Sequence, residues 1–170
     1  MKYHPISSQL FTKNRTKLSQ LMRPNSIAVF NSNDVFSTGA DSTLPFEQHR
    51  NIFYLSGVDQ EESILVVFPD AREKAHREIL FVKETNDHIA VWEGAKLSKS
   101  QATAVSGIQT VCWLEEFDSI FPKLMSEAKT FYFNNNDHYR QAVEMETRDD
   151  RFLKMIKSTY PKHEILPSFP

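Results

Sequence analysis

Glycine and cysteine are both scarce in this chain of 170 residues. The four glycines, at positions 39, 57, 94 and 107, are too dispersed to build a glycine-rich phosphate loop, which argues against the common nucleotide-binding enzymes. A single cysteine, Cys112, excludes an intrachain disulfide and a cysteine-based zinc site. Because Cys112 lies in the apolar run TVCWL, we expect it to be an inert core thiol.

The sequence also lacks an excess of positive charge and a long hydrophobic run. Twenty Lys and Arg against 22 Asp and Glu give a net charge of −2, whereas binding to a phosphate backbone needs a basic surface. No apolar run approaches the roughly 18 to 20 residues that span a bilayer, and the N-terminal sequence has no hydrophobic signal core. We therefore expect a cytoplasmic protein, with neither nucleic acid nor membrane as a partner, folded as one domain over residues 1–170.

Patterns that would hold a metal ion or an activated nucleophile are not found either. The six histidines form neither HxxxH nor HExxH, and there is no Gly-x-Ser-x-Gly elbow. The pairs Asp87-His88 and Asp137-His138 are poor chelates, because adjacent side chains do not share a face of a strand or helix. The acidic groups DQEES (59–63) and RDDR (148–151) are interpreted as hydrated turns or helix caps. The residues alone predict no catalytic and no metal site in this chain.

Helix signals are clear at several points. Ser7 or Ser8 can cap a first helix that ends before Pro24, and Ser98 with Gln101 has the spacing of a capping box. Gly107 is a natural terminator of the helix that begins at Ser98. Further helices are expected within residues 115–128, where Pro122 is a local conflict, and within 139–156.

Apolar runs predict the strands. They cover residues 26–32, 51–57, 63–69, 78–83, 88–92, 110–114 and 130–134. The early strands follow one another directly, and the later ones alternate with helices. This order predicts an α/β fold, a mixed β-sheet flanked by helices.

One longer stretch carries a family resemblance. Residues 41–69 read DSTLPFEQHRNIFYLSGVDQEESILVVFP, with an Asp-Ser pair, a Pro-Phe-Glu-Gln segment, Phe-Tyr-Leu-Ser-Gly, an acidic turn and an apolar strand. A second block, EILFVKETNDHIAVWEGAKLS (78–98), ends in Trp-x-Gly. Together they resemble the N-terminal domain of Xaa-Pro aminopeptidases (aminopeptidase P) and prolidases, which are creatinase-type metallopeptidases. The resemblance extends over nearly the whole chain and implies the ribonuclease H-like fold of that domain.

The resemblance also implies where catalysis takes place. In this family a C-terminal domain binds two metal ions, usually manganese, and a metal-bridging hydroxide attacks the bond before proline. That domain is absent from this chain, so we expect residues 1–170 to be catalytically inactive and to hold no cofactor. The implied partners are the chain's own C-terminal catalytic domain, a second or further copies in a homodimer or homotetramer, and peptide substrates with proline at the second position.

Five residues are candidates for roles in such an enzyme. By the resemblance, Trp92 would line the proline-side pocket, and Asp41 would hold the ammonium group of a peptide N-terminus. Gln48 and Arg50 are expected to fix their loop or contact a partner subunit. Tyr54, which alternates with Phe53 along the predicted strand 51–57, is a candidate interface residue.

The sequence departs from the family pattern at two places, and other proteins with the same architecture are alternatives to an Xaa-Pro aminopeptidase. No basic residue stands at positions 37–40, where the family often has Arg-x-x-Asp, and Glu47 replaces an Arg often found before the Gln. The same architecture serves prolidase, which takes dipeptides, and creatinase. It also serves a non-catalytic protein-binding module, as in histone chaperone subunits.

Overall fold

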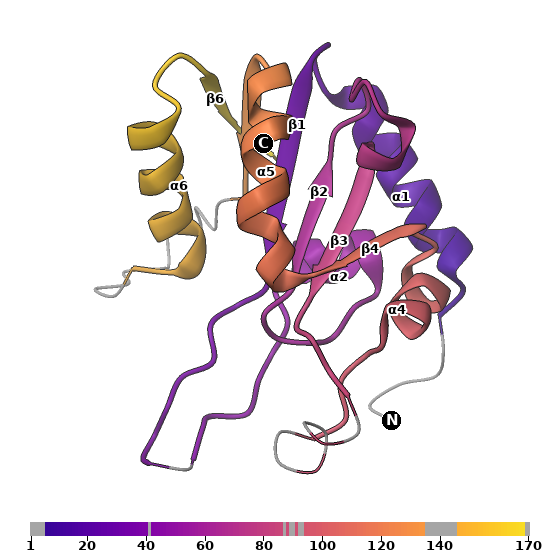
Figure 1. Cartoon of the computed structure of the whole chain (residues 1–170), viewed down its shortest axis with the longest axis vertical. Coiled ribbons are helices and arrows are strands. Elements are labelled where there is room, and N and C mark those ends of the chain that lie inside the picture. The colour runs from indigo at the N-terminus through magenta and orange to yellow at the C-terminus, as the bar shows by residue number, and fades with distance from the viewer. Residues whose placement is uncertain are drawn as a thin grey trace.

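A six-stranded mixed sheet forms the centre of the computed structural model, which describes residues 6–40, 42–86, 88, 91, 94–134 and 146–168 (Figure 1). The strand order is β4-β3-β2-β1-β5-β6. Strand β2 is antiparallel to its neighbours β1 and β3, and the other pairs are parallel. Five strands therefore end at the same edge of the sheet. Their bounds are β1 Ser26–Asn31, β2 Ile64–Val67, β3 Glu78–Val82, β4 Thr110–Trp113, β5 Thr130–Phe133 and β6 Glu164–Pro167.

Helices cover both faces of this sheet (Figure 1). Helices α1 (Ser8–Leu21), α2 (Arg50–Ser56) and α4 (Lys99–Ser106) pack on one face, and α5 (Phe117–Glu127) and α6 (Arg148–Thr159) on the other. Successive residues of a strand contribute to opposite cores: in β1, Ile27 and Val29 face α5 and α6, whereas Ala28 and Phe30 face α1 and α2. The predicted α/β fold, a mixed sheet flanked by helices, is confirmed. None of the helices in the described part of the chain is long and apolar enough to cross a bilayer.

The predicted caps of α1 and α4 are confirmed. Ser7 caps α1, and Ser98 and Gln101 form the expected capping box before α4, which ends at Gly107. At α6, Thr147 and Asp150 form another capping box, so RDDR (148–151) is in part a helix cap as interpreted. Pro122 lies inside α5, which begins at Phe117 after a 3₁₀ turn, Leu114–Glu116.

The strand predicted at residues 51–57 is wrong, because this segment forms helix α2. The buried residues Ile52, Leu55 and Ser56 follow a helical spacing, and His49 caps the N-terminus by accepting a hydrogen bond from Asn51 N. Phe53 packs edge-on against Phe11 of α1 (ring centroids 6.3 Å apart). Contacts with α1 thus override the β propensity of these aromatic and branched residues.

The C-terminal end also differs from the prediction. Residues 164–167, for which no strand was predicted, form strand β6 and pair in parallel with β5. Pro167 is compatible with that place because β6 is an edge strand. Most of the strand predicted at 88–92 lies outside the described residues.

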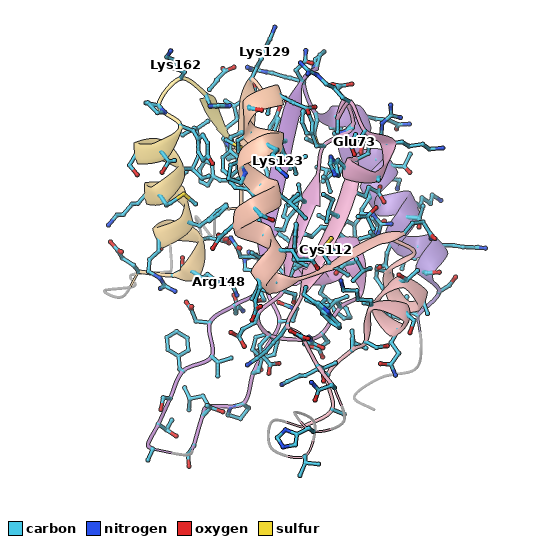
Figure 2. All side chains as sticks on the ribbon, viewed as in Figure 1. Glu73, Cys112, Lys123, Lys129, Arg148 and Lys162 are labelled. Carbon is cyan, nitrogen blue, oxygen red and sulfur yellow. The ribbon has the colours of Figure 1, made fainter. Side chains whose placement is uncertain are left out.

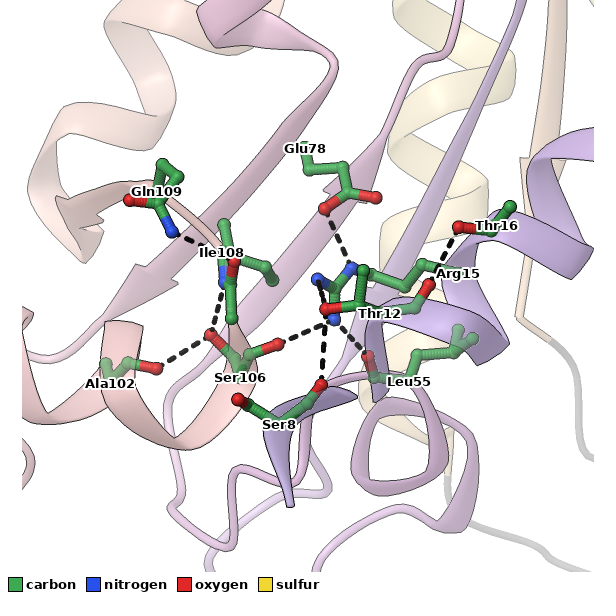
Figure 3. Close-up of polar contacts among 11 residues, drawn as sticks. Ser8, Thr12, Arg15, Thr16, Leu55, Glu78, Ala102, Ser106, Ile108 and Gln109 are labelled. Atoms are coloured by element: carbon green, nitrogen blue, oxygen red, sulfur yellow. Dashed lines mark hydrogen bonds and ion pairs between the residues drawn. The ribbon is translucent and has the colours of Figure 1, made fainter. Parts of the chain in front are cut away.

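A buried arginine joins three helices and a strand on the α1 face (Figure 3). Arg15 of α1 is fully buried, and its Nη1 donates to the carbonyl oxygens of Leu55 (2.8 Å) and Ser106 (3.0 Å). Its Nε donates to Glu78 of β3 at 2.9 Å. The two carbonyls belong to the last turns of α2 and α4, so a single guanidinium satisfies the C-terminal ends of two helices, where a positive charge is favourable.

Helices α2 and α4 end in the same way. Each ends in a buried serine followed by a left-handed glycine, in the sequences Leu-Ser-Gly-Val (55–58) and Val-Ser-Gly-Ile (105–108). Each serine hydroxyl donates to the carbonyl four residues earlier and accepts from the amide two residues later. At Gly57 a Cβ atom would collide with the ring of Phe11, so this position needs glycine for its space as well as its backbone.

We predict that Arg15→Met lowers the free energy of unfolding by about 3 kcal/mol, because two buried carbonyls lose charge-assisted hydrogen bonds. Urea unfolding followed by circular dichroism measures this. Lys17→Met, an exposed change on the same helix, is the matched control and should change stability by less than about 0.5 kcal/mol. Equal urea midpoints for the two variants would show that Arg15 does not contribute to the stability of the fold.

Candidate functional site

Two long segments extend from the edge where β1, β3, β4, β5 and β6 end (Figure 1). The first, the arm (residues 32–48), joins β1 to α2, and the second, the β3–α4 segment (residues 83–97), joins β3 to α4. In α/β sheets, ligands bind beyond the carboxyl ends of parallel strands. We therefore take this edge as the candidate functional site.

The arm is a hairpin-like extension with exposed apolar side chains. Thr38 N donates to the carbonyl of Ser42 (2.8 Å), and Leu44 N donates to the carbonyl of Phe36 (2.9 Å). Val35, Phe36 and Leu44 are 42%, 46% and 53% exposed. Three large apolar side chains close together on an extended segment are typical of a surface that another protein part covers.

The sequence-predicted site residues are only partly placed. Asp41 and Trp92 lie outside the described residues; by sequence, Asp41 belongs to the arm and Trp92 to the β3–α4 segment. Gln48, at the end of the arm, donates from Nε2 to the carbonyls of Val58 (3.1 Å) and Gln60 (2.8 Å). These bonds attach the end of the arm to residues 58–60, and the role expected for Gln48, fixing the loop or contacting a partner subunit, stays a prediction.

The other two candidates lie on helix α2, and not on a strand. Arg50 is its exposed first residue. Tyr54 is 51% exposed, while its carbonyl accepts a hydrogen bond from Asn14 Nδ2. Phe53 and Tyr54 therefore do not alternate across a sheet, and their different exposure results from the turn of the helix.

A buried polar cluster that the sequence did not predict joins α6 to the sheet at this edge. Asp149 of α6 accepts hydrogen bonds from the side-chain amides of Asn31, at the end of β1, and Asn134, just after β5, both at 2.7 Å. Asn134 Nδ2 also lies 3.2 Å from both ring nitrogens of His49, and its Oδ1 accepts from Asn51 Nδ2 (2.6 Å). The available sequence signal was an asparagine at the end of one apolar strand and another directly after a second strand.

Burial has opposite effects on the two titratable groups of this cluster. It raises the pKa of Asp149 to about 6, against the opposing hydrogen bonds from Asn31 and Asn134 and the positive charge of Arg148. It lowers the pKa of His49, and the neighbouring charge of Arg50 acts in the same direction. The cluster therefore favours a neutral His49 near neutral pH.

A pocket of about 380 Å³ separates the arm from this cluster. Phe36, Leu44 and Pro45 form its arm side, and its other side includes His49 and the start of α6. Arg148, at the N-terminal end of α6 (Figure 2), lines the pocket and donates from Nη1 to Ser32 Oγ (2.8 Å). The lining is mixed, because the arm also contributes polar residues, namely Ser32, Asn33, Asp34 and Glu47.

The described residues do not make a metal centre, because no group of three or more His, Cys, Asp or Glu side chains among them could hold an ion.

Cys112, labelled in Figure 2, is half-buried on β4. Burial and the nearby Glu116 carboxylate raise the pKa of its thiol, which disfavours the reactive thiolate.

The fold defines the class of this chain: an α/β domain with a mixed, helix-covered sheet and two long segments at its carboxyl edge. Residues 11–132 match the family model "Aminopeptidase P, N-terminal domain". The chain therefore belongs to the aminopeptidase P N-terminal domain family.

Curated relatives agree with this assignment. The chain is 30% identical over 105 residues to Xaa-Pro aminopeptidase 3 of Homo sapiens, covering 61% of the chain and 21% of that protein. It is 25% identical over 127 residues to the Xaa-Pro aminopeptidase of Haemophilus influenzae, covering 75% and 29%. The chain thus spans between a fifth and a third of the length of these relatives.

Solved structures share the fold. A Bacillus anthracis chain described as an aminopeptidase P superposes with a TM-score of 0.86 at 23% identity, covering 97% of this chain and 39% of that one. The Pseudomonas aeruginosa aminopeptidase PepP gives a TM-score of 0.77 at 19% identity, covering 96% and 37%.

We predict that Asp149 makes the free energy of unfolding fall as the pH rises from about 4 to about 6. A carboxyl whose pKa is raised in the folded state stabilises it only while protonated, and the loss is at most about 3 kcal/mol for a shift from 3.8 to about 6. Urea unfolding of the unmodified chain and of Asp149→Asn across pH 4 to 8 measures the pH-dependent contribution of Asp149 to the free energy of unfolding. His49, present in both, cancels in the difference. If the difference in unfolding free energy between the two proteins does not vary with pH, the prediction is contradicted.

Proposed function

We propose that this chain is the non-catalytic N-terminal domain of a dimetal Xaa-Pro aminopeptidase, which removes an N-terminal residue that precedes proline. The family match over residues 11–132 carries this proposal. The names of the relatives from Homo sapiens and Haemophilus influenzae give the activity. The domain itself would form a wall of the active-site entrance and support a homodimer or homotetramer.

The carboxyl edge is the part of the domain suited to that wall. The arm and the β3–α4 segment both extend from it (Figure 1), and the arm exposes Val35, Phe36 and Leu44. A catalytic domain or a second copy that covers these side chains would remove apolar surface from water. A narrow entrance formed in this way would restrict substrates to peptides with a free N-terminus.

The proposed substrate contacts lie in the same two segments. Trp92 would offer an aromatic face to the pyrrolidine ring of the proline, and Asp41 would pair with the substrate ammonium group. The chemistry itself belongs to the catalytic domain, where two manganese ions would be bound. The described residues of this chain do not fit that role, since they contain no suitable group of ligands.

An assay of the full-length protein, loaded with manganese, tests the proposal. The substrates are a short peptide with proline at its second position and an Xaa-Pro dipeptide, and residues 1–170 alone are the control. We expect cleavage of the longer peptide by the full-length protein and none by the control. Activity confined to the dipeptide would identify a prolidase, and a full-length protein inert on both would favour a protein-binding module.

Two variants test the substrate contacts. In the full-length enzyme, we expect Trp92→Ala and Asp41→Asn each to lower kcat/KM for the longer peptide by about tenfold, the equivalent of one lost contact of about 1.4 kcal/mol. Phe36→Ala alters the exposed surface of the arm and is the control for assembly. Analytical ultracentrifugation of all three variants, done beside the kinetics, distinguishes a loss of substrate contact from a change of oligomeric state. Unchanged kcat/KM in both Trp92→Ala and Asp41→Asn would refute the assigned contacts.

A further inference from the structure

The α2–β2 connector (residues 58–63) holds the arm at both of its ends. At the beginning of the arm, Ser32 N donates to the carbonyl of Ser63 (2.9 Å), and Ser63 N donates to Ser32 Oγ (3.1 Å). At its end, the Gln48 amide donates to the carbonyls of Val58 and Gln60. Both ends of the arm are therefore hydrogen-bonded to the same six-residue connector.

The same connector also holds both ends of the β3–α4 segment. Glu62 forms an ion pair with Lys83 (2.8 Å), the first residue after β3. Gln60 Oε1 accepts a hydrogen bond from Leu97 N (2.7 Å), and Glu61 forms an ion pair with Lys96. Three consecutive connector residues thus bind the beginning and the end of a fifteen-residue segment.

This arrangement corrects the interpretation of DQEES (59–63) as a hydrated turn. Gln60 and Ser63 are buried, at 5% and 0% exposure, and the side chains of Glu61 and Lys96 are only 22% and 13% exposed. The side chains of Gln60, Glu61 and Glu62 contact the β3–α4 segment, and backbone groups of the connector contact the arm. The acidic composition of the motif concealed this because two of its carboxylates neutralise lysines that are distant in sequence.

The connector retains two locally unfavourable features. The Gln60 Nε2 group is buried without a hydrogen-bond partner, although its Oε1 is used. Glu62 has a left-handed backbone with φ of 52°, which is uncommon for a residue other than glycine. A buried donor without a partner and a strained backbone both reduce stability, and such features concentrate at functional positions.

We propose that the α2–β2 connector is a positioning element that couples the arm to the β3–α4 segment and fixes the spacing between them. Because Gln60 is bonded to the end of each segment, a displacement of one is transmitted to the other. Its catalytic consequence rests on the proposed function: the connector would hold in place the two segments to which the proposed substrate-contact residues Asp41 and Trp92 belong by sequence. Gln48, Gln60 and Glu61 are then positioning residues for the reaction.

Hydrogen–deuterium exchange and steady-state kinetics on the full-length protein test this together. Gln48→Met removes the arm contact, and Glu61→Gln removes the charge that pairs with Lys96. We expect either variant to raise amide exchange in both residues 33–47 and residues 83–97 by about threefold or more, the equivalent of a loss of about 0.65 kcal/mol. The KM for the longer peptide should rise about three- to tenfold, with kcat changed by less than about twofold.

Two further variants make the test specific. The charge exchange Glu61→Lys with Lys96→Glu should recover at least half of the KM effect, whereas loss of folding would not be recovered. Arg23→Met breaks an ion pair with Glu164 (2.8 Å) away from the connector. It should leave exchange in both segments and the KM unchanged.

The outcomes separate this proposal from the function it rests on. Changed exchange in both segments with a full-length protein inert on proline peptides would support the coupling and overturn the function. An active enzyme in which Gln48→Met and Glu61→Gln behave like Arg23→Met would overturn the positioning role and leave the function standing. Exchange raised only in the segment next to each substitution would also overturn the coupling.

Discussion

The structure depends most on the buried guanidinium of Arg15. It joins α1 to the C-terminal ends of α2 and α4 and to Glu78 of β3. The C-terminal end of α2 leads into the α2–β2 connector, and α4, whose C-terminal end Arg15 binds, begins directly after the β3–α4 segment. A positive charge with several donors suits this place, because helix C-termini present unpaired carbonyls and partial negative charge. Arg15 therefore fixes the framework from which the candidate functional edge extends.

On the opposite face of the sheet, Asp149 has a corresponding but weaker role. Its carboxylate attaches the N-terminal end of α6 to the ends of β1 and β5, and apolar packing of Ile156 secures the remainder of the helix. A carboxylate buried with amide donors has a raised pKa, whereas the buried Arg15 guanidinium is paired with the carboxylate of Glu78. The α6 side of the candidate functional edge is thus expected to respond to pH through Asp149.

Under the proposed function, this edge would contribute to a reaction carried out by a neighbouring catalytic domain. Long segments between regular elements are mobile unless their ends are held, and substrate contacts need a defined geometry. Here the ends of the arm and of the β3–α4 segment meet on the connector 58–63. Under the proposed function, the sheet and the connector would position loop residues next to a substrate bound by the catalytic domain.

The sequence by itself determined the class of fold, most strand positions, the capped ends of α1 and α4 and, through motif spacing, the family. These features depend on local patterns: apolar periodicity, serine caps and left-handed glycines. Only the tertiary structure decided that residues 50–56 are helical, that 164–167 pair as a sixth strand, and that DQEES binds two distant segments. Each of these results depends on partners far away in sequence, such as Phe11 and Arg15 for α2, strand β5 for β6, and Lys83 and Lys96 for the connector, and no local pattern encodes such contacts.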